Sequence, residues 1–221
     1  MADRQRIDRE HPIGGEMSDI LSGLFRRFQL SYLLRHYSSI PVLALFSFMN
    51  GCLSIGIMAL AALVTDAPFV FPSLGPTAFL LFYTPTAPPA APRNVIIGHA
   101  IGAAAGYLSL AAFGLQGAGP AIAVGVTWSR VLAAGLSLGL TSGLMVLLRA
   151  PHPPAGATTL IIALGILRKP WQLGVLMLAV VLLTAQGFVI NRLAGVRYPA
   201  WSPVQEEEST RPEPPRVRER A

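Results

Sequence analysis

The stretch RAPHPPAGATTLII, residues 149–162, places a cation, a histidine and three prolines directly before a run of small and β-branched residues. Proline has no backbone N–H and disfavours helix in the residue before it, so we expect extended chain that becomes helical near Gly156. The apolar part, 152–166, is too short to cross a bilayer as a regular helix, which rises about 1.5 Å per residue. The stretch therefore predicts a short helix with irregular backbone before it.

The chain around this stretch has the composition of a membrane protein. Of its 221 residues, 52% are hydrophobic and 13% are charged, whereas roughly a quarter of a soluble domain is charged. Between residues 40 and 191 there are five bases and one acid, Asp66. A soluble core of that length would need a polar surface, so we predict one membrane domain at 38–199, with the lipid bilayer as its partner.

The formal net charge of +6 comes from bases in the two ends of the chain and at the ends of apolar segments. This distribution is typical of charges that set membrane topology, and it predicts no nucleic-acid binding. Residues 1–18 and 200–221 are rich in Arg, Glu and Pro and are predicted to be disordered tails. Apolar residues recur at helical spacing across 19–37, which predicts an amphipathic interfacial helix.

Four apolar segments are long enough to cross a hydrocarbon core, which takes about 20 residues. They run over residues 41–64, 94–114, 122–148 and 171–191. Two further stretches, 68–85 and 152–166, are shorter and begin with proline and glycine. The predicted fold class is an all-α membrane protein with four full-length transmembrane helices plus two short Pro/Gly-broken membrane segments.

The two short segments align with each other. The sequence PSLGPTAFLL at 72–81 corresponds to PPAGATTLII at 153–162, at an offset of 81 residues. We interpret the chain as two copies of one unit, with repeat halves at about 40–115 and 121–192. Each unit would consist of a long helix, a broken short segment and a second long helix.

Charge bias favours a topology in which both short segments cross the membrane. The cytoplasm then receives the basic N-terminal region with most of the other bases, and only two bases lie outside. The bases on the two sides are Arg93, Arg149, Arg192 and Arg197 against Arg168 and Lys169. Three crossings per copy give an inverted repeat, a plan found in many secondary transporters. We expect a multi-pass protein of the cell inner (plasma) membrane with a cytoplasmic N-terminus.

The starts of the two short helices predict a binding site. Irregular backbone at membrane depth is tolerated only inside protein or beside a watery cavity, and a helix start offers free N–H groups and positive dipole charge. Two such starts brought together would suit a small anion, as does the absence of buried acids. Nearby hydroxyls come from Ser73, Thr77, Thr158 and Thr159. The competing interpretation of these prolines and glycines is a kink and close helix packing.

Two ionisable residues, His99 and Arg130, lie inside long apolar segments and are functional candidates by default. His99 can be a proton carrier, a gate or a packing residue. Arg130 can instead extend its charged head to the outer surface.

Other residues are predicted to be structural. A face of small residues predicts close helix approach, and four aromatic residues near segment ends are expected to be interface anchors without chemistry. These are Gly98, Gly102 and Gly106, and Trp128, Trp171, Tyr198 and Trp201. No nucleotide loop, paired carboxylates, nucleophile with a base or clustered metal ligands are visible. We therefore expect no enzyme, no catalytic residues, no cofactor and no metal.

Three motifs, APRNVIIGH at 91–99, RAPHPPAGAT at 149–158 and INRLAGVRYP at 190–199, resemble the HPP family of integral membrane proteins. The family is named for a His-Pro-Pro motif, here 152–154, and the resemblance covers about residues 36–199. It implies a small multi-helix membrane protein, often described as four-spanning. Plant and cyanobacterial relatives are associated with nitrite transport. The residues that the resemblance marks are Pro72, Gly75, Pro92, Arg93, Asn94, Gly98, His99, His152, Pro153, Pro154, Gly156, Ala157 and Thr158.

Together these features predict membrane transport of a small inorganic anion, nitrite first, at the N-termini of the two half-length helices. Positive potential on the cytoplasmic approach would come from Arg93, Arg149 or His152. The alternative is a structural or sensory integral membrane protein without transport activity. The coupling ion and a homo-oligomer are left open. The predicted substrate-binding residues are Ser73, Gly75, Thr77, Arg93, Asn94, His99, His152, Pro153, Pro154, Gly156, Thr158 and Thr159.

Overall fold

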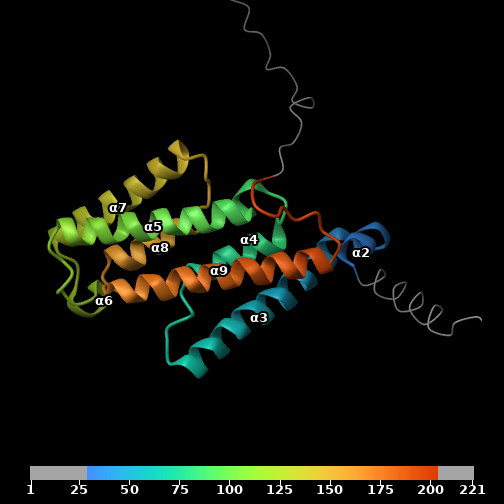
Figure 1. Ribbon diagram of the computed structural model, residues 1–221, viewed down its shortest axis with the longest axis horizontal. Helices are drawn as coiled ribbons and strands as arrows, with labels where there is room; N and C mark the ends of the chain where they lie inside the picture. The colour runs from blue at the N-terminus through green and yellow to red at the C-terminus, as the bar shows by residue number, and fades with distance from the viewer. Residues whose placement is uncertain (1–28, 204–221) are drawn as a thin grey trace, which may run out of the picture.

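The computed structural model describes residues 29–203, in which every regular element is a helix (Figure 1). Four of these helices are long and apolar enough to cross a membrane, which confirms the predicted number of long spans. They are α3 (Ser39–Thr65), α5 (Pro92–Ala112), α7 (Trp128–Leu147) and α9 (Pro170–Leu193).

Both ends of the chain reach beyond the described residues. The predicted tail at 1–18, the first part of the predicted amphipathic helix and residues 204–221 all lie outside them. The last part of that amphipathic segment forms α2 (Leu30–His36). Of the predicted C-terminal tail, Trp201 is held against the start of α5, because its carbonyl accepts from the Arg93 N–H at 3.0 Å.

The third long span begins later than predicted. The apolar run from residue 122 is divided into α6 (Ala121–Val124) and α7, because Gly125 has a φ of 84° and ends the first piece. The side chain of Thr127 then accepts from the Arg130 N–H and caps the start of α7. The expectation of one helix over 122–148 is therefore wrong at its N-terminal end.

Two short helices follow the proline-rich stretches, α4 (Leu74–Tyr83) and α8 (Ala155–Ala163). Each begins one residue before the glycine expected to mark its start. A 3-10 helix, η1 (Pro88–Ala90), connects α4 to α5. The prolines thus delay helix formation in both stretches, as their missing N–H groups require.

The helix α5 lies at the centre of the molecule and is the most buried of the four long helices. It packs against α7, α8 and α9. Its glycines face α8: a Cβ at Gly102 would lie 2.6 Å from the Ala155 carbonyl oxygen, and one at Gly106 would lie 2.8 Å from that of Thr159. The predicted close approach along this face is confirmed.

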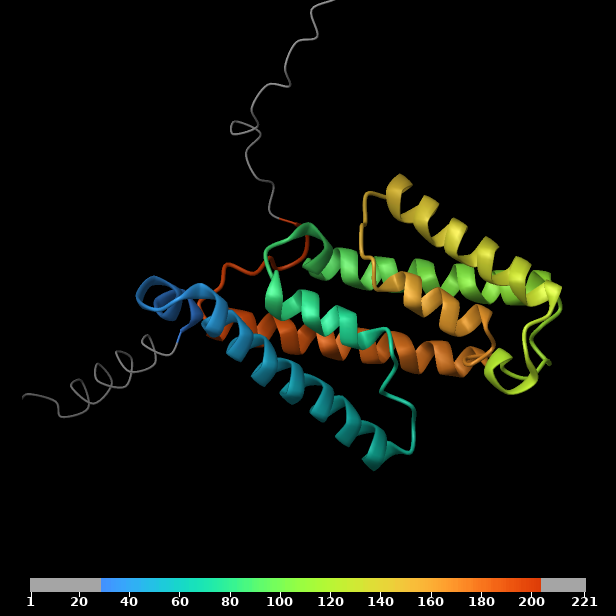
Figure 2. The same ribbon diagram turned by 180° about the vertical axis from the view of Figure 1, so that it is seen from behind.

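The helices α4 and α8 both start in the middle of the molecule and run to opposite ends (Figures 1 and 2). The end of α4 leads through η1 to the start of α5, and the end of α8 leads to the start of α9 at the other end. α4 packs on α3 and α9, and α8 packs on α5 and α7.

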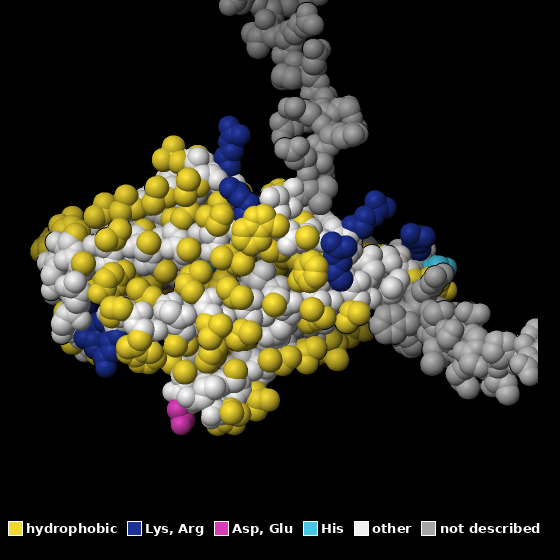
Figure 3. Space-filling model, in the orientation of Figure 1, with side chains coloured by type: hydrophobic (Ala, Val, Ile, Leu, Met, Phe, Trp, Pro, Cys, Tyr) yellow, Lys and Arg dark blue, Asp and Glu magenta, His cyan; other side chains and the backbone are white. Residues whose placement is uncertain are grey.

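Charged side chains gather at the two ends, and the flanks are largely apolar (Figure 3). In the part of the chain that the structure describes, Asp66 is the only acid, and it follows the last residue of α3. Apolar flanks between charged ends are what a protein surrounded by lipid needs.

Candidate functional site

The imidazole of His99 lies between the two short helices and contacts both. Its Nε2 is 2.9 Å from the Thr77 hydroxyl oxygen, on the first turn of α4. Its Nδ1 is 2.7 Å from the Thr158 hydroxyl oxygen, on the first turn of α8. All three side chains are fully buried. The two threonines are the residues that the internal alignment pairs, so equivalent positions of the two short helices hold the two nitrogens of one histidine.

A second buried histidine completes this polar cluster. His152 lies just before α8, and its Nε2 is 3.1 Å from His99 Nε2 and 3.2 Å from the Thr77 hydroxyl. Its Nδ1 is 2.8 Å from the carbonyl oxygen of Pro89 in η1. Four separate segments therefore meet here. We call His99 and His152 the His pair, and Thr77 and Thr158 are its hydroxyl partners.

The partners of the His pair assign its protons when both rings are neutral. A carbonyl oxygen only accepts, so His152 Nδ1 carries a proton and donates to Pro89. The bare His152 Nε2 then accepts from the N–H of His99 Nε2. His99 Nδ1 is left bare and accepts from the Thr158 hydroxyl. The Thr77 hydroxyl donates to the Ser73 carbonyl oxygen at 3.0 Å.

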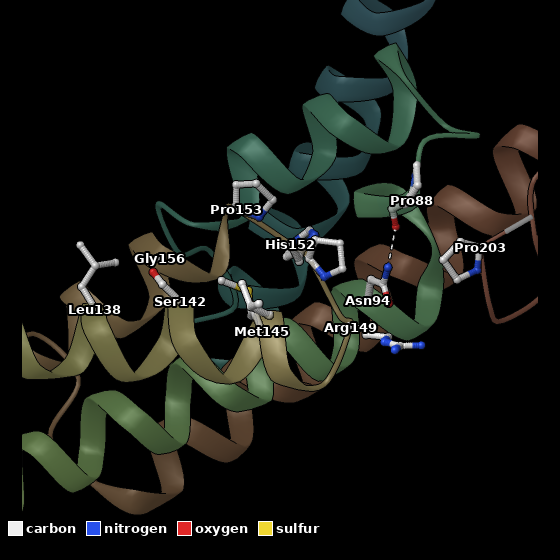
Figure 4. Close-up of a pocket in the computed structure, with 12 residues that line it drawn as sticks. Pro88, Asn94, Leu138, Ser142, Met145, Arg149, His152, Pro153, Gly156 and Pro203 are labelled. Atoms are coloured by element: carbon white, nitrogen blue, oxygen red, sulfur yellow. Dashed lines mark hydrogen bonds between the residues drawn. The ribbon is translucent and has the colours of Figure 1, made fainter. Parts of the chain in front are cut away.

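A cavity of about 730 Å³ opens beside the His pair, between α7 and the segment that leads into α8 (Figure 4). His152, Pro153 and Gly156 form its inner wall, and Arg149 lies at its rim at the end where α5 begins. The residues that line it are Pro88, Asn94, Leu138, Ser142, Met145, Val146, Arg149, Pro151, His152, Pro153, Gly156 and Pro203.

The first amides of α8 do not point free into this cavity, which corrects the expected helix-start site. The N–H groups of Ala155, Gly156 and Ala157 donate to the carbonyls of the three residues before the helix, at 2.9 to 3.1 Å. Pro153 and Pro154 occupy the positions where unpaired N–H groups would otherwise lie. Donors to a ligand must therefore come from side chains.

The predicted binding residues separate into three groups. Asn94, His152, Pro153 and Gly156 line the cavity. Thr77, His99 and Thr158 lie behind it, where the two threonine hydroxyls contact the His99 ring of the His pair. Of the remaining positions, Arg93 bonds to residues of the cavity rim. The other four belong to neither place: Ser73 and Thr159 are buried with hydroxyls that have no hydrogen-bond partner, Pro154 is buried, and Gly75 is exposed.

Arg93 holds the rim of the cavity together. Its guanidinium donates to the carbonyls of Leu148 and Arg149 at 3.2 and 3.0 Å and to the Asn94 side chain at 3.0 Å. The Asn94 amide in turn donates to Pro88 at 2.8 Å. These bonds join the start of α5 to the end of α7, so Arg93 supports the cavity wall while the neighbouring Arg149 side chain faces the opening.

The guanidinium of Arg130 is buried, which contradicts the alternative that it extends to the outer surface. It donates to the Ala163 carbonyl at 2.9 Å and to the Gly119 carbonyl at 2.7 Å. Ala163 is the last residue of α8, and a cation there stabilises the negative end of the helix dipole. Gly165, with a φ of 83°, leaves the room that the guanidinium occupies.

Tyr198 is the one predicted interface anchor that the structure contradicts. It is fully buried, and its hydroxyl donates to the Ala90 carbonyl at 2.6 Å. Burial raises the pKa of Tyr198 above its ordinary value. Trp128, Trp171 and Trp201 are at least half exposed, as anchors would be. Tyr198 instead ties the segment after α9 to η1.

Sequence reasoning missed the contributions of η1 and α7. Pro89 supplies the carbonyl that orients His152, and Ser142 supplies a hydroxyl in the cavity wall. A signal for Ser142 exists, because the polar pair Thr141–Ser142 interrupts the apolar second half of α7. No local pattern marks the Pro89 carbonyl, whose role depends on a contact across 63 residues of sequence.

Comparison with known proteins agrees with the fold. Residues 38–199 match the family model described as HPP, transmembrane region. A transmembrane protein of Dictyostelium discoideum is 31% identical over 126 residues, which cover 53% of this chain and 39% of that protein. The chain thus spans less than half the length of this curated relative. No solved structure matches significantly. The match to the family model extends over most of the chain, which therefore belongs to the HPP family of multi-pass integral membrane proteins.

Proposed function

We propose that this protein moves a small inorganic anion, nitrite first, across the membrane through the cavity beside the His pair. The observation that carries the proposal is the position of the cavity. It opens at the end that holds Arg149, and its inner wall is His152 and Gly156. Asp66, the one acid in the part of the chain that the structure describes, does not line the cavity, so no carboxylate there repels a negatively charged solute.

The chemistry of the wall suits a small anion. Arg149 provides positive potential at the opening, which raises the local concentration of anions. Ser142 on α7 adds a hydroxyl among apolar neighbours such as Leu138, and the Asn94 side chain adds a polar group near Arg149 (Figure 4). A pore of this kind moves solute and needs no catalytic group, so the proposal is transport rather than enzymatic activity.

An inverted repeat is part of the proposal. Each short helix packs on the first long helix of its own half and on the last long helix of the other half: α4 on α3 and α9, and α8 on α7 and α5. The paired contacts of Thr77 and Thr158 with His99 support the same symmetry. In this topology both short segments cross, and the end with Arg149 faces the cytoplasm.

Transport by purified protein in liposomes tests the proposal. Initial rates of nitrite, nitrate and formate uptake are measured against protein-free liposomes. We expect saturable uptake of at least one anion. Arg149→Gln is expected to lower uptake several-fold at low anion concentration, because it removes the charge at the opening. The matched control is Arg197→Gln, which removes an exposed cation that does not line the cavity.

Absence of saturable flux for every anion would refute the proposal. It would favour the alternative of a structural or sensory protein. The structure gives that alternative one supporting observation, since the His pair joins α4, α5, α8 and η1 by hydrogen bonds within the fold. In that case substitutions in the His pair change stability alone.

A further inference from the structure

The His pair has a feature that anion transport by itself does not use. Its two Nε2 atoms face each other at 3.1 Å, a distance that requires one proton between them. His152 Nδ1 must carry a second proton for Pro89. The neutral pair therefore holds two protons on four nitrogens. Of the two bare nitrogens, His152 Nε2 accepts from His99, and His99 Nδ1 accepts from the Thr158 hydroxyl.

The pair has room for one more proton without losing a hydrogen bond. The proton comes from a hydronium ion, which becomes water, and it adds to the lone pair of His99 Nδ1. Thr158 then turns its hydroxyl hydrogen away and accepts from Nδ1 through its oxygen, because a hydroxyl both donates and accepts. In this state all four ring nitrogens face acceptors or share the central proton, and the pair carries one positive charge.

No acidic side chain of the described residues can neutralise that charge. Asp66, their only acid, follows the last residue of α3 and is exposed on the surface (magenta in Figure 3), whereas both histidines are fully buried. The elements around the pair present hydroxyls from α4 and α8 and a carbonyl from η1. Two titratable side chains on these elements, Tyr83 and Tyr107, stack on Phe79 and pack against the core, respectively. The other charged or titratable side chains are bound elsewhere or lie at the cavity rim: Arg93, Arg130, Arg149, Arg192 and Tyr198.

The partner for the charge must therefore come from the cavity. His152 forms the cavity wall and its Nε2 shares a proton with His99, so an anion beside His152 would lie one ring away from the positively charged His99. Charges attract strongly in a medium of low dielectric constant, so binding of each ion favours binding of the other. As a coupling ion, a metal ion is a poorer candidate than a proton, because the described residues contain no group of three or more His, Cys, Asp or Glu that could hold one.

We infer that the coupling ion is a proton: the pair of His99 and His152 takes up one proton for each anion that enters the cavity. This inference rests on the proposed transport function. When the anion leaves, His99 Nδ1 releases the proton to water on the side to which the anion goes, so each cycle moves one proton and one anion in the same direction. For a monovalent anion the cycle carries no net charge.

The test uses nitrate accumulation in proteoliposomes. Nitric acid is a strong acid, so it does not leak through lipid in neutral form as nitrous and formic acids do. With the membrane voltage clamped at zero by potassium and valinomycin, an inward gradient of one pH unit should drive about tenfold nitrate accumulation. A dye inside the vesicles should report one proton entering per nitrate. His99→Gln and His152→Gln should abolish accumulation, and the control His36→Gln should keep it, since His36 bonds only within α2.

The outcomes separate this inference from the proposed function. Saturable nitrite or nitrate flux without accumulation at zero voltage would overturn proton coupling and leave anion transport standing. Absence of any saturable flux would refute both. Accumulation retained in both His99→Gln and His152→Gln would place the proton elsewhere and overturn the inference.

If the histidine variants transport no anion at all, a second measurement tests whether the His pair is the proton site. In wild-type protein labelled with ¹⁵N-histidine, added nitrate should convert one imidazole to the imidazolium form at neutral pH. That signal should be missing in His152→Gln and present in His36→Gln. If nitrate changes no histidine signal in the wild-type protein, the His pair is not the proton site.

Discussion

Neighbouring residues in α8 have opposite roles in the buried cluster. The Thr158 hydroxyl donates a hydrogen bond to His99 Nδ1 at 2.7 Å. The Thr159 side chain is equally buried, but its hydroxyl has no partner. A buried hydroxyl without a hydrogen bond costs stability, whereas one that satisfies another buried group contributes to it. The Thr158 hydroxyl therefore contributes to the stability of the fold, whereas the Thr159 hydroxyl does not.

Valine substitutions, which keep the shape of threonine, should separate these roles. Thr158→Val leaves the bare His99 Nδ1 without a donor, and we expect a loss of about 1 kcal/mol in the free energy of unfolding. Thr159→Val removes a hydroxyl without a partner and should leave the melting temperature unchanged or raise it. Thermal unfolding in detergent measures both. Equal effects of the two substitutions would contradict the hydrogen-bond assignment.

At the scale of elements, the contact between α5 and α8 depends on the absence of side chains. A Cβ at Gly102 would lie 2.6 Å from the Ala155 carbonyl oxygen, which is backbone and cannot rotate away. On α7, Gly143 has nothing within 4 Å of its Cβ position and is exposed. The surroundings of the two glycines thus differ. The position of α8 beside the His pair depends on the absence of a side chain at Gly102.

Alanine substitutions test this contact. Gly102→Ala should lower the free energy of unfolding by about 1–3 kcal/mol, because overpacking forces α5 and α8 apart. Gly143→Ala should have no effect or a stabilising one, since alanine is the better helix former. Melting temperatures of the two purified variants give the comparison. A neutral Gly102→Ala would show that the two helices are not in close contact.

For the molecule as a whole, the distribution of charge predicts its orientation. Arg149 lies at the rim of the cavity, and Arg197 follows the end of α9. Lys169 lies between α8 and α9, at the other end of the molecule (Figure 1). Bases are retained on the cytoplasmic side of membranes, so the end with the cavity should face inward. The same orientation places the proposed proton and anion site within reach of the cytoplasm.

Single cysteines test this orientation. In a Cys52→Ser background, Lys169→Cys should react with a membrane-impermeant thiol reagent added to intact cells. Arg197→Cys should react only after the cells are opened. Both positions are exposed, so reactivity reports sidedness rather than burial. The opposite pattern would invert the proposed topology, and labelling of both positions in intact cells would exclude it.

The sequence alone determined the class of the protein and most of its elements. Runs of apolar residues are a local property, so four spans could be predicted, and proline acts on its own backbone, so the delayed starts of α4 and α8 could be predicted too. The start of α7 was missed because Gly125 adopts a positive φ that composition does not reveal.

The tertiary structure alone decided what the functional candidates contact. His99 meets Thr77, Thr158 and His152 across separations of 22 to 59 residues, and no local pattern encodes such contacts. Packing also buried the Arg130 guanidinium against the end of α8 and satisfied the amides at its start. Local chain chemistry specifies where helices begin and end, whereas the pairing of side chains depends on how those helices pack, which is a property of the whole molecule.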